Sequence, residues 1–283
     1  MAKTHDLKRR IRSIKNTMQV TKAMKMVSSA RLRRAQERIL AARPGAIATR
    51  RVLSSLAARA NPELHPLLTQ RPVRRVEIVL ITSDRGLCGS FNANLLKMGV
   101  QFVLSRPSEE VSVLTVGRRG RDAVRRRRLN NSGEWLDVFR NLEFGTARAI
   151  AEDLIRRYTN EEIDAVFVAY NEFKNVASQK PVIEQILPVP REELREATED
   201  YIYEPDPRTL LDALLPAYVR MEIWRALLES AAAEHAARMT AMDSATKNAK
   251  ELTDALTLHM NRVRQASITT EIIEVVSGAE ALG

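Results

Sequence analysis

The chain has 283 residues and a formal charge of +10, with 45 lysine and arginine residues against 35 aspartate and glutamate residues. Apolar residues make up 45% of it, which is enough for a packed core and excludes disorder as the main state. Glycine and proline are few, 10 and 11 residues, which favours long helices over an all-β architecture.

The composition also limits the chemistry that we expect. Cys88 is the single cysteine and cannot form an internal disulfide, and we see no secretory leader, so we expect a reducing compartment. Charges interrupt every apolar stretch before it reaches the roughly 18 residues that a spanning helix needs, so any tie to a membrane runs through partners. The four histidines have no metal-ligand spacing, and we expect neither a metal nor a cofactor.

Positive charge is concentrated at the N-terminus, where residues 1–51 hold 15 lysine and arginine residues and only two acidic residues. Apolar and small residues recur there at alternating steps of four and three, the spacing of a coiled-coil seam. We therefore predict one long helix over residues 1–60, locally bent or loosened at Pro44 and Gly45. The seam positions are Leu7, Ile11, Ile14, Met18, Thr21, Lys25, Ser28, Leu32, Ala35, Ile39, Ala42, Ala46, Thr49, Leu53, Leu56 and Ala60.

After a proline-containing border at residues 61–75, the period changes to short β-branched runs that are typical of buried strands. These runs alternate with helical stretches, which is the pattern of βαβ units on a mostly parallel sheet. We therefore predict a Rossmann-like α/β domain over residues 75–190. The strands are expected at 76–82, 111–116, 165–170 and 182–187, and the helices at 94–104, 120–128 and 146–158.

From residue 208 the steps of four and three return, and after Pro216 the next proline or glycine is Gly278. We predict a second long helix over residues 208–283, after a border at 188–208. Each terminal helix alone would expose an apolar stripe, so we expect the two to pair antiparallel. The predicted fold class is mixed α+β and α/β, with a long antiparallel coiled coil of the terminal helices and a central Rossmann-like α/β domain.

Three segments could carry a site. Residues 83–90 follow the first strand, where α/β folds bind phosphates, but they lack a glycine-rich phosphate motif, so a plain turn or a protein contact competes with a nucleotide site. The run Arg125–Arg128 is typical of a solvated helix end and, less commonly, of a nucleic-acid contact. The last 19 residues, from Gln265, contain no basic residue and are strongly apolar, which favours a tip held by a partner.

Several motifs lie in order along essentially the whole chain. They are KRRI at 8–11, NT at 16–17, VTKAMKMV at 20–27, LRRAQ at 32–36, SDRGLCG at 83–89, DYIYEPDP at 200–207, ARM at 237–239, ATKNA at 245–249, NRVRQASIT at 261–269 and EVVSGA at 274–279. Together they resemble the gamma subunit family of F-type ATP synthases.

The resemblance implies a rotor shaft that stands inside a ring of three alpha and three beta subunits, one shaft per ring. ATP is then made or hydrolysed on the beta subunits, and the chain has no active site of its own. The further partners implied are the epsilon subunit and the membrane c-ring, through which proton or sodium flow turns the shaft. Because we see no transit peptide, we expect a peripheral protein at the cytoplasmic face of a bacterial inner membrane.

The resemblance also implies roles for individual residues, by matching positions. Met24, Lys25 and Arg238 correspond to a lower contact with a beta-subunit loop, and the turn with Asp84, Arg85 and Cys88 to another lower beta contact. The upper contact with beta corresponds to Arg264, Gln265, Thr269 and Glu274. The foot that faces epsilon and the membrane ring corresponds to Tyr201, Tyr203 and Glu204.

Two classes of function compete with this interpretation. A basic coiled-coil protein that binds nucleic acid would explain the charge of residues 1–51, but that segment has no aromatic residue for base stacking. A small α/β hydrolase or nucleotide-binding enzyme would explain the central domain, but the sequence shows no paired-carboxylate or Ser/His/Asp arrangement.

Overall fold

The computed structural model describes residues 2–59, 65–190 and 207–280. The described chain forms two compact units, Met1–Ser28 with Met239–Gly283 and Ser29–Arg238. The elements are α1 (Ala2–Arg59), η2 (Pro66–Leu68), β1 (Arg75–Ile81), α2 (Phe91–Leu104), β2 (Glu110–Val116), α3 (Arg118–Arg127), β3 (Asn131–Trp135), η3 (Val138–Arg140), α4 (Phe144–Thr159), β4 (Ala165–Phe173), β5 (Gln179–Leu187) and α5 (Pro207–Glu280).

The first unit pairs the start of α1 with the second half of α5. The hydroxyl oxygens of Thr21 and Thr246 lie 2.8 Å apart, and Lys25 Nζ donates to Asp243 Oδ1 at 2.6 Å. Residue numbers rise along α1 while those of the partners fall along α5, so the two helices run in opposite directions. The predicted antiparallel pairing of the terminal helices is therefore confirmed in this unit.

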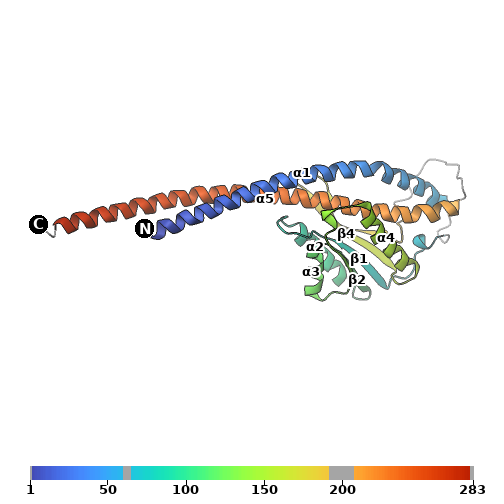
Figure 1. Cartoon of the computed structure of the whole chain (residues 1–283). Coiled ribbons are helices and arrows are strands. Elements are labelled where there is room, and N and C mark those ends of the chain that lie inside the picture. Colours follow the sequence, from blue (N-terminus) through green and yellow to red (C-terminus); the bar gives the residue numbers. More distant parts are fainter. Residues whose placement is uncertain (1, 60–64, 191–206, 281–283) are drawn as a thin grey trace. The chain divides into compact units, whose positions relative to one another are not determined.

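The same register decides where the paired region ends. It places Ala2, the first residue of α1, level with about residue 265 of α5, because each step along one helix is matched by a step back along the other. Beyond that level α5 continues to Glu280 as a single helix (Figure 1). Its apolar side chains there are exposed: Ile268, Ile272, Ile273, Val275 and Val276.

The second unit is built on a five-stranded sheet with the order β3-β2-β1-β4-β5. All neighbours pair in parallel except β4 and β5, which pair antiparallel. The mostly parallel sheet was predicted, and the four predicted strands are present. The sequence analysis missed β3, because Asn-Ser-Gly-Glu-Trp at this edge has neither the alternation nor the β-branched residues of a buried strand.

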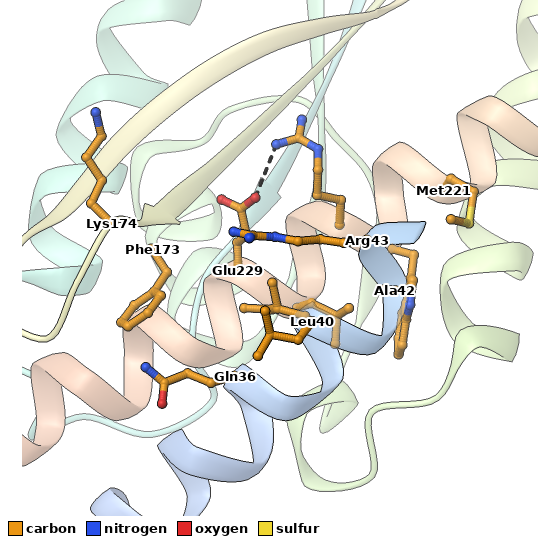
Figure 2. A pocket seen from close by; sticks show the side chains of 12 residues that line it. Gln36, Leu40, Ala42, Arg43, Phe173, Lys174, Met221 and Glu229 are labelled. Atoms are coloured by element: carbon orange, nitrogen blue, oxygen red, sulfur yellow. Dashed lines mark hydrogen bonds and ion pairs between the residues drawn. The ribbon is translucent and has the colours of Figure 1, made fainter. Parts of the chain in front are cut away.

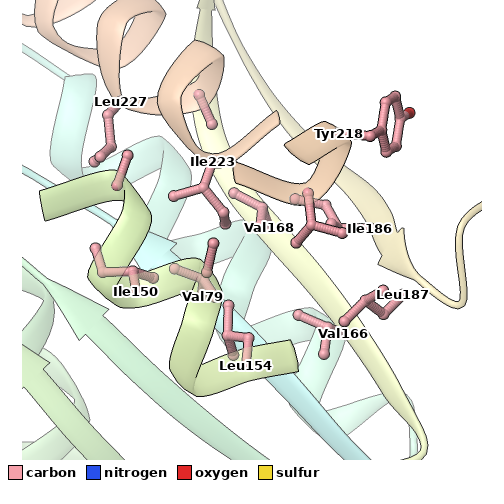
Figure 3. Packing of buried hydrophobic residues seen from close by; sticks show 14 of the residues in the cluster. Val79, Ile150, Leu154, Val166, Val168, Ile186, Leu187, Tyr218, Ile223 and Leu227 are labelled. Carbon is pink, nitrogen blue, oxygen red and sulfur yellow. The ribbon is translucent and has the colours of Figure 1, made fainter. Parts of the chain in front are cut away.

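Alternation along β1 divides the core into two layers. Ile78 and Leu80 face the side covered by α2 and α3, and Val79 and Ile81 face the side covered by α4 and α5. On this second side, side chains from two helices interleave with the sheet (Figure 3). They are Ile150 and Leu154 of α4 and Ile223 and Leu227 of α5, against Val79, Val166 and Val168.

The helices begin earlier than the sequence pattern predicts. Each of α2, α3 and α4 starts two or three residues before its predicted range. The helix α5 begins at Pro207 and continues through Pro216, although a proline inside a helix removes a hydrogen bond and costs about 3 kcal/mol. Leu215 and Val219 beside this proline are buried in the core, so apolar burial offsets that cost.

A buried carboxylate fixes the start of β1 against the start of β4. The Asp164 side chain is only 4% exposed, and its Oδ1 atom lies 3.0 Å from Arg71 Nε and 3.1 Å from Arg75 Nη2. Its Oδ2 atom accepts hydrogen bonds from the backbone N–H groups of Arg74 and Arg75. Burial raises the pKa of this carboxyl, but the hydrogen bonds from Arg75 and Arg74 outweigh burial and hold the pKa below its ordinary value.

We expect the substitution Asp164→Asn to lower the free energy of unfolding by about 3 kcal/mol, because it removes the buried charge that two backbone N–H groups and two arginines contact. Asp153→Asn is the matched control: Asp153 pairs with Arg156 on the surface and is 40% exposed, so its loss costs less than about 1 kcal/mol. Urea unfolding of both variants measures the difference.

The same comparison has a defined pH dependence. The pKa of Asp164 is depressed in the folded state, so the stability that its charge provides is present above the ordinary value of 3.8 and is lost as the pH falls through the folded pKa. The gap between the wild-type chain and Asp164→Asn therefore narrows below about pH 4. A gap that stays constant to pH 3 would contradict this account.

Candidate functional site

The turn after β1 is held in place by hydrogen bonds between side chains and backbone N–H groups of neighbouring segments. The carboxylate of Asp84 accepts hydrogen bonds from the backbone N–H groups of Arg118 and Asp137, each at 3.1 Å. Asn92 Oδ1 accepts from the backbone N–H of Ser83 at 3.0 Å. These bonds fix the turn against the start of α3 and the segment before η3, so it forms a defined surface.

The geometry of this turn does not favour a phosphate site. The turn leads into α2, whose first N–H group, on Phe91, bonds to the carbonyl oxygen of Cys88. The neighbouring N–H groups at the start of α3 also have acceptors in the chain: Arg118 N–H bonds to Asp84, Arg119 N–H to Ser83 and Gly120 N–H to Thr82. An anion needs such groups free, and the Asp84 carboxylate would repel it. The alternative left by the sequence, a protein contact, fits better.

The side chains of the turn point in different directions. Arg85 is exposed, and Leu87 has a backbone φ of +63° and a side chain that is 63% exposed. Cys88 is buried against Phe91 and Ala233, and burial raises the pKa of its thiol. Leu87 was not predicted, because nothing in the Gly-Leu-Cys-Gly run distinguishes the outward-facing leucine from the buried Cys88.

The turn is also tied to α5 by Arg238, which forms a buried ion pair within that helix. Arg238 Nη2 lies 2.6 Å from Glu234 Oε1 and donates to the carbonyl oxygen of Gly86 at 3.2 Å. The Glu234 side chain is 7% exposed; burial raises the pKa of this carboxyl and Arg238 opposes that effect. Of the predicted residues, the structure therefore brings Arg238 together with the Asp84–Cys88 turn. Glu234 was missed, because its role depends on a fold that brings the turn to α5.

Met24 and Lys25 belong to the first unit. Lys25 pairs with Asp243, which also lies 3.3 Å from Lys247 Nζ, and Met24 is half-buried beside this group. The adjacent Met26 is exposed. This segment therefore combines a fixed charge pair with accessible apolar side chains.

The four residues predicted for the upper contact lie on α5 of the first unit. Arg264, Gln265, Thr269 and Glu274 are all exposed, at or beyond the level where α1 begins. Tyr201, Tyr203 and Glu204 lie outside the described residues.

A groove in the second unit was not predicted. It has a volume of about 470 Å³ and lies between α1, α5 and the end of β4. Figure 2 shows Phe173 and Lys174 on one side, Leu40 and Gln36 on another, and Arg43 beside Glu229. The sequence could not indicate it, because its walls come from three segments far apart in the chain.

Charges at this groove are paired on one side. Arg225 bonds to Glu229 at 3.3 Å, to Glu222 at 2.7 Å and to the hydroxyl of Tyr170 at 2.7 Å. Burial lowers the pKa of Arg225, but Glu222 and the other carboxylates outweigh it, so the net effect is to raise the pKa. The network is a structural support for α5 on the sheet.

The described residues contain no group of three or more histidine, cysteine, aspartate or glutamate side chains placed to hold a metal ion. None of the described helices has an apolar stretch long enough to cross a bilayer.

Comparison with known proteins gives consistent matches. The family model described as ATP synthase matches residues 3–282. Among curated proteins, the chain is 54% identical to the ATP synthase gamma chain of Solibacter usitatus, over 98% of each chain, and 51% identical to that of an Anaeromyxobacter species, over the full length of both.

Solved structures agree. The chain is similar to one from the central stalk and c-ring of the Tetrahymena thermophila mitochondrial ATP synthase, with a TM-score of 0.60 and 28% identity over 80% of this chain and 99% of that one. A chain of the Euglena gracilis mitochondrial ATP synthase rotor has the same fold, with a TM-score of 0.70 and 20% identity over 94% of this chain and 99% of that one.

The ion pair of Arg238 with Glu234 can be tested with a double mutant. Arg238→Met leaves the buried Glu234 carboxylate unpaired and lowers the free energy of unfolding by about 3 kcal/mol. Adding Glu234→Leu removes the orphaned charge, so the double variant recovers most of that loss. Urea unfolding, monitored by the fluorescence of Trp135 and Trp224, measures the free energy of unfolding of the single and the double variant. A double variant as unstable as Arg238→Met would show that the bond to Gly86 dominates instead.

Proposed function

The chain belongs to the family of ATP synthase gamma chains and is a central rotor shaft, and we propose that it couples ion flow through a membrane ring to ATP synthesis or hydrolysis on the beta subunits. It does so by rotating inside a hexamer of three alpha and three beta subunits. The observation that carries this proposal is the helix pair of the first unit, which ends in a single exposed apolar helix.

This construction suits a shaft for a physical reason. An antiparallel pair that tapers to one helix has no threefold symmetry, so three equivalent partners around it meet different side chains. A partner's conformational equilibrium shifts only by its differential contacts with the shaft. Turning an asymmetric shaft therefore takes each partner through a series of contacts in turn, without a catalytic group on the shaft.

We propose that catalysis resides on the beta subunits and that this chain is non-catalytic. In support, two buried carboxylates are engaged in structural ion pairs, Glu234 with Arg238 and Asp164 with Arg71 and Arg75. The nucleic-acid alternative gains no support from α1, because part of its positive charge is paired with carboxylates, as with Asp6 and Asp243.

The proposed partners are the alpha and beta subunits, at one copy of this chain per three of each, the epsilon subunit and the membrane c-ring. The shaft comprises residues 1–60 and 208–283, and residues 75–190 form the α/β domain.

The proposed contact residues fall into three groups. Lower beta contacts use Met24, Lys25, Asp84, Arg85, Cys88 and Arg238, with Cys88 acting through the shape of its turn because its side chain is buried. Upper beta contacts use Arg264, Gln265, Thr269 and Glu274, and the foot uses Tyr201, Tyr203 and Glu204.

The proposed location follows from these partners. The chain is held at the cytoplasmic face of a bacterial inner membrane through the c-ring and epsilon, as a peripheral subunit. The exposed apolar side chains of the α5 tip are covered by the hexamer, which explains why they can be apolar in a protein that works in water.

Reconstitution with alpha and beta subunits tests the shaft function. The full chain should co-purify with them at one copy per three, and the complex should hydrolyse ATP and rotate a probe fixed to this chain. A chain that lacks residues 266–283 should lose several-fold in torque, because the single-helix tip that the hexamer would hold is gone. Its sheet should unfold at an unchanged urea concentration, since the second unit contains none of these residues.

Two outcomes would count against the proposal. One is unchanged torque after removal of residues 266–283. The other is ATP hydrolysis by this chain alone at the rate of the complex, which would place catalysis on the shaft.

Coupling can be tested at the proposed lower contact with Met24→Lys. The new cation would strengthen the bond to a partner loop in one rotational position and so hinder departure from it. We expect ions pumped per ATP hydrolysed to fall by more than half while assembly is kept. Met26→Lys is the matched control, because two residues along a helix turn the side chain by about 200°, away from that contact. Equal effects of the two variants would overturn the assignment of Met24.

A further inference from the structure

A second cavity of the Ser29–Arg238 unit is lined by positive charge. It measures about 240 Å³ and lies where α1, the segment around η3 and α5 meet. Four arginines line it, Arg31, Arg34 and Arg38 from α1 and Arg140 from η3, and none of its described lining residues is acidic. Such a cavity is unlike the groove of Figure 2, where the arginine on α5 is paired with carboxylates.

These four arginines are exposed, and none of them forms an ion pair with a described acidic residue, although other arginines of α1 do, as Arg33 does with Glu37. Arg31 acts on Glu234 only at longer range, where its charge lowers the pKa of that carboxyl. Arg38 donates a hydrogen bond to the carbonyl oxygen of Leu142 at 3.1 Å, which orients its side chain but supplies no negative charge. Four guanidinium groups around one concave space without a paired carboxylate favour an anion there.

A histidine of α5 also lines the cavity. The Nδ1 atom of His235 is enclosed without a hydrogen-bond partner and is not accessible from the cavity. Burial, followed by the charges of Arg238 and Arg31, lowers the pKa of this histidine to about 4, so the ring is neutral near pH 7. The imidazole therefore adds no positive charge to the arginines, and its ring serves as a reporter of what the cavity holds.

The carboxylate next to His235 in sequence does not bond to the cavity arginines. Glu234 Oε1 pairs with Arg238 at 2.6 Å, and Glu234 Oε2 has no hydrogen-bond partner. The rest of the lining includes Asn141 and apolar residues such as Phe139, Leu142 and Leu228. The cavity therefore combines convergent cationic donors, a neutral imidazole and a partly apolar wall.

We propose that this cavity binds an oligophosphate, meaning a chain of two or three phosphoryl groups, either free or as part of a nucleotide. The guanidinium fork matches the geometry of phosphate oxygens and can bond to two of them at once. Several negative charges on one small ligand match four unpaired arginines better than a single carboxylate does. The concave shape, enclosed by three elements, suits a compact anion better than an extended acidic peptide.

Isothermal titration calorimetry of the full chain at about 0.15 M ionic strength, where long-range attraction is screened, tests the proposal. The probes are pyrophosphate, tripolyphosphate, ADP and ATP. We expect pyrophosphate or tripolyphosphate to bind once per chain with a micromolar dissociation constant. ATP that binds no more tightly than tripolyphosphate identifies the phosphate chain as the recognised group, and tighter binding of ATP identifies a nucleotide as its source.

The test variant is R34Q/R140Q, which removes two exposed cavity arginines and leaves Arg38 and its bond to Leu142 in place. Pyrophosphate affinity should fall at least ten-fold. The matched control is R12Q/R127Q, which removes the same charge from exposed arginines elsewhere on α1 and α3 and should change affinity less than three-fold. Circular dichroism confirms that both variants are folded.

A readout on the wild-type chain keeps the test independent of any variant. Pyrophosphate should shift the ring nitrogen signals of His235 in NMR spectra while those of exposed His259 stay in place. Equal affinity of R34Q/R140Q and the control, no saturation below millimolar pyrophosphate, or unmoved His235 signals would overturn the proposal. So would a hexaglutamate peptide that binds more tightly than pyrophosphate through Arg34 and Arg140, because the cavity would then receive an acidic protein segment.

Discussion

Every part of this molecule depends on how the apolar seams of α1 and α5 are covered. A stripe repeated at steps of four and three cannot remain in water at no cost, and each unit covers it differently. In the first unit the two helices cover each other, with Thr21 and Lys25 fixing the register against Thr246 and Asp243. In the second unit a neighbouring set of α5 positions, including Ile223 and Leu227, covers the sheet. The helix α5 is therefore apolar on one face for the helix pair and on another for the sheet.

The end of the first unit is a single exposed helix, and this determines how the shaft can contact a partner. Because the register places the start of α1 level with about residue 265, the last turns of α5 carry apolar residues but have no α1 beside them to cover these side chains. A monomeric protein rarely leaves such side chains together in water, so the tip is built for a partner. Its asymmetry makes the surface that a partner meets depend on the direction of approach, which is the property that a rotary element requires.

Much of this could be read from the sequence, and the failures have physical causes. The seams, the four buried strands and the antiparallel pairing follow from periodicity, because burial imposes a repeat on the sequence. The edge strand β3 escaped because it is largely exposed and needs no apolar alternation. The α5 helix passes through Pro216 because tertiary packing outweighs local propensity. The pair of Glu234 with Arg238, the exposed Leu87 and the arginine cavity all need contacts between distant segments, which spacing within a segment cannot indicate.

The basic N-terminal segment shows how contacts change the meaning of a charge count. Its excess of lysine and arginine suggests a general attraction to anions, yet the charges are of two kinds. Arg9, Arg10, Lys25 and Arg33 have carboxylates within reach, so much of their field is cancelled locally. Arg31 and Arg34 form no ion pair with a described residue and converge with Arg140 beside a neutral imidazole. Other basic residues of α1, such as Arg12 and Lys22, also have no ion pair among the described residues, but they do not line this cavity. It is the convergence of arginines on one concave space that favours a small, highly charged ligand over a long polyanion there.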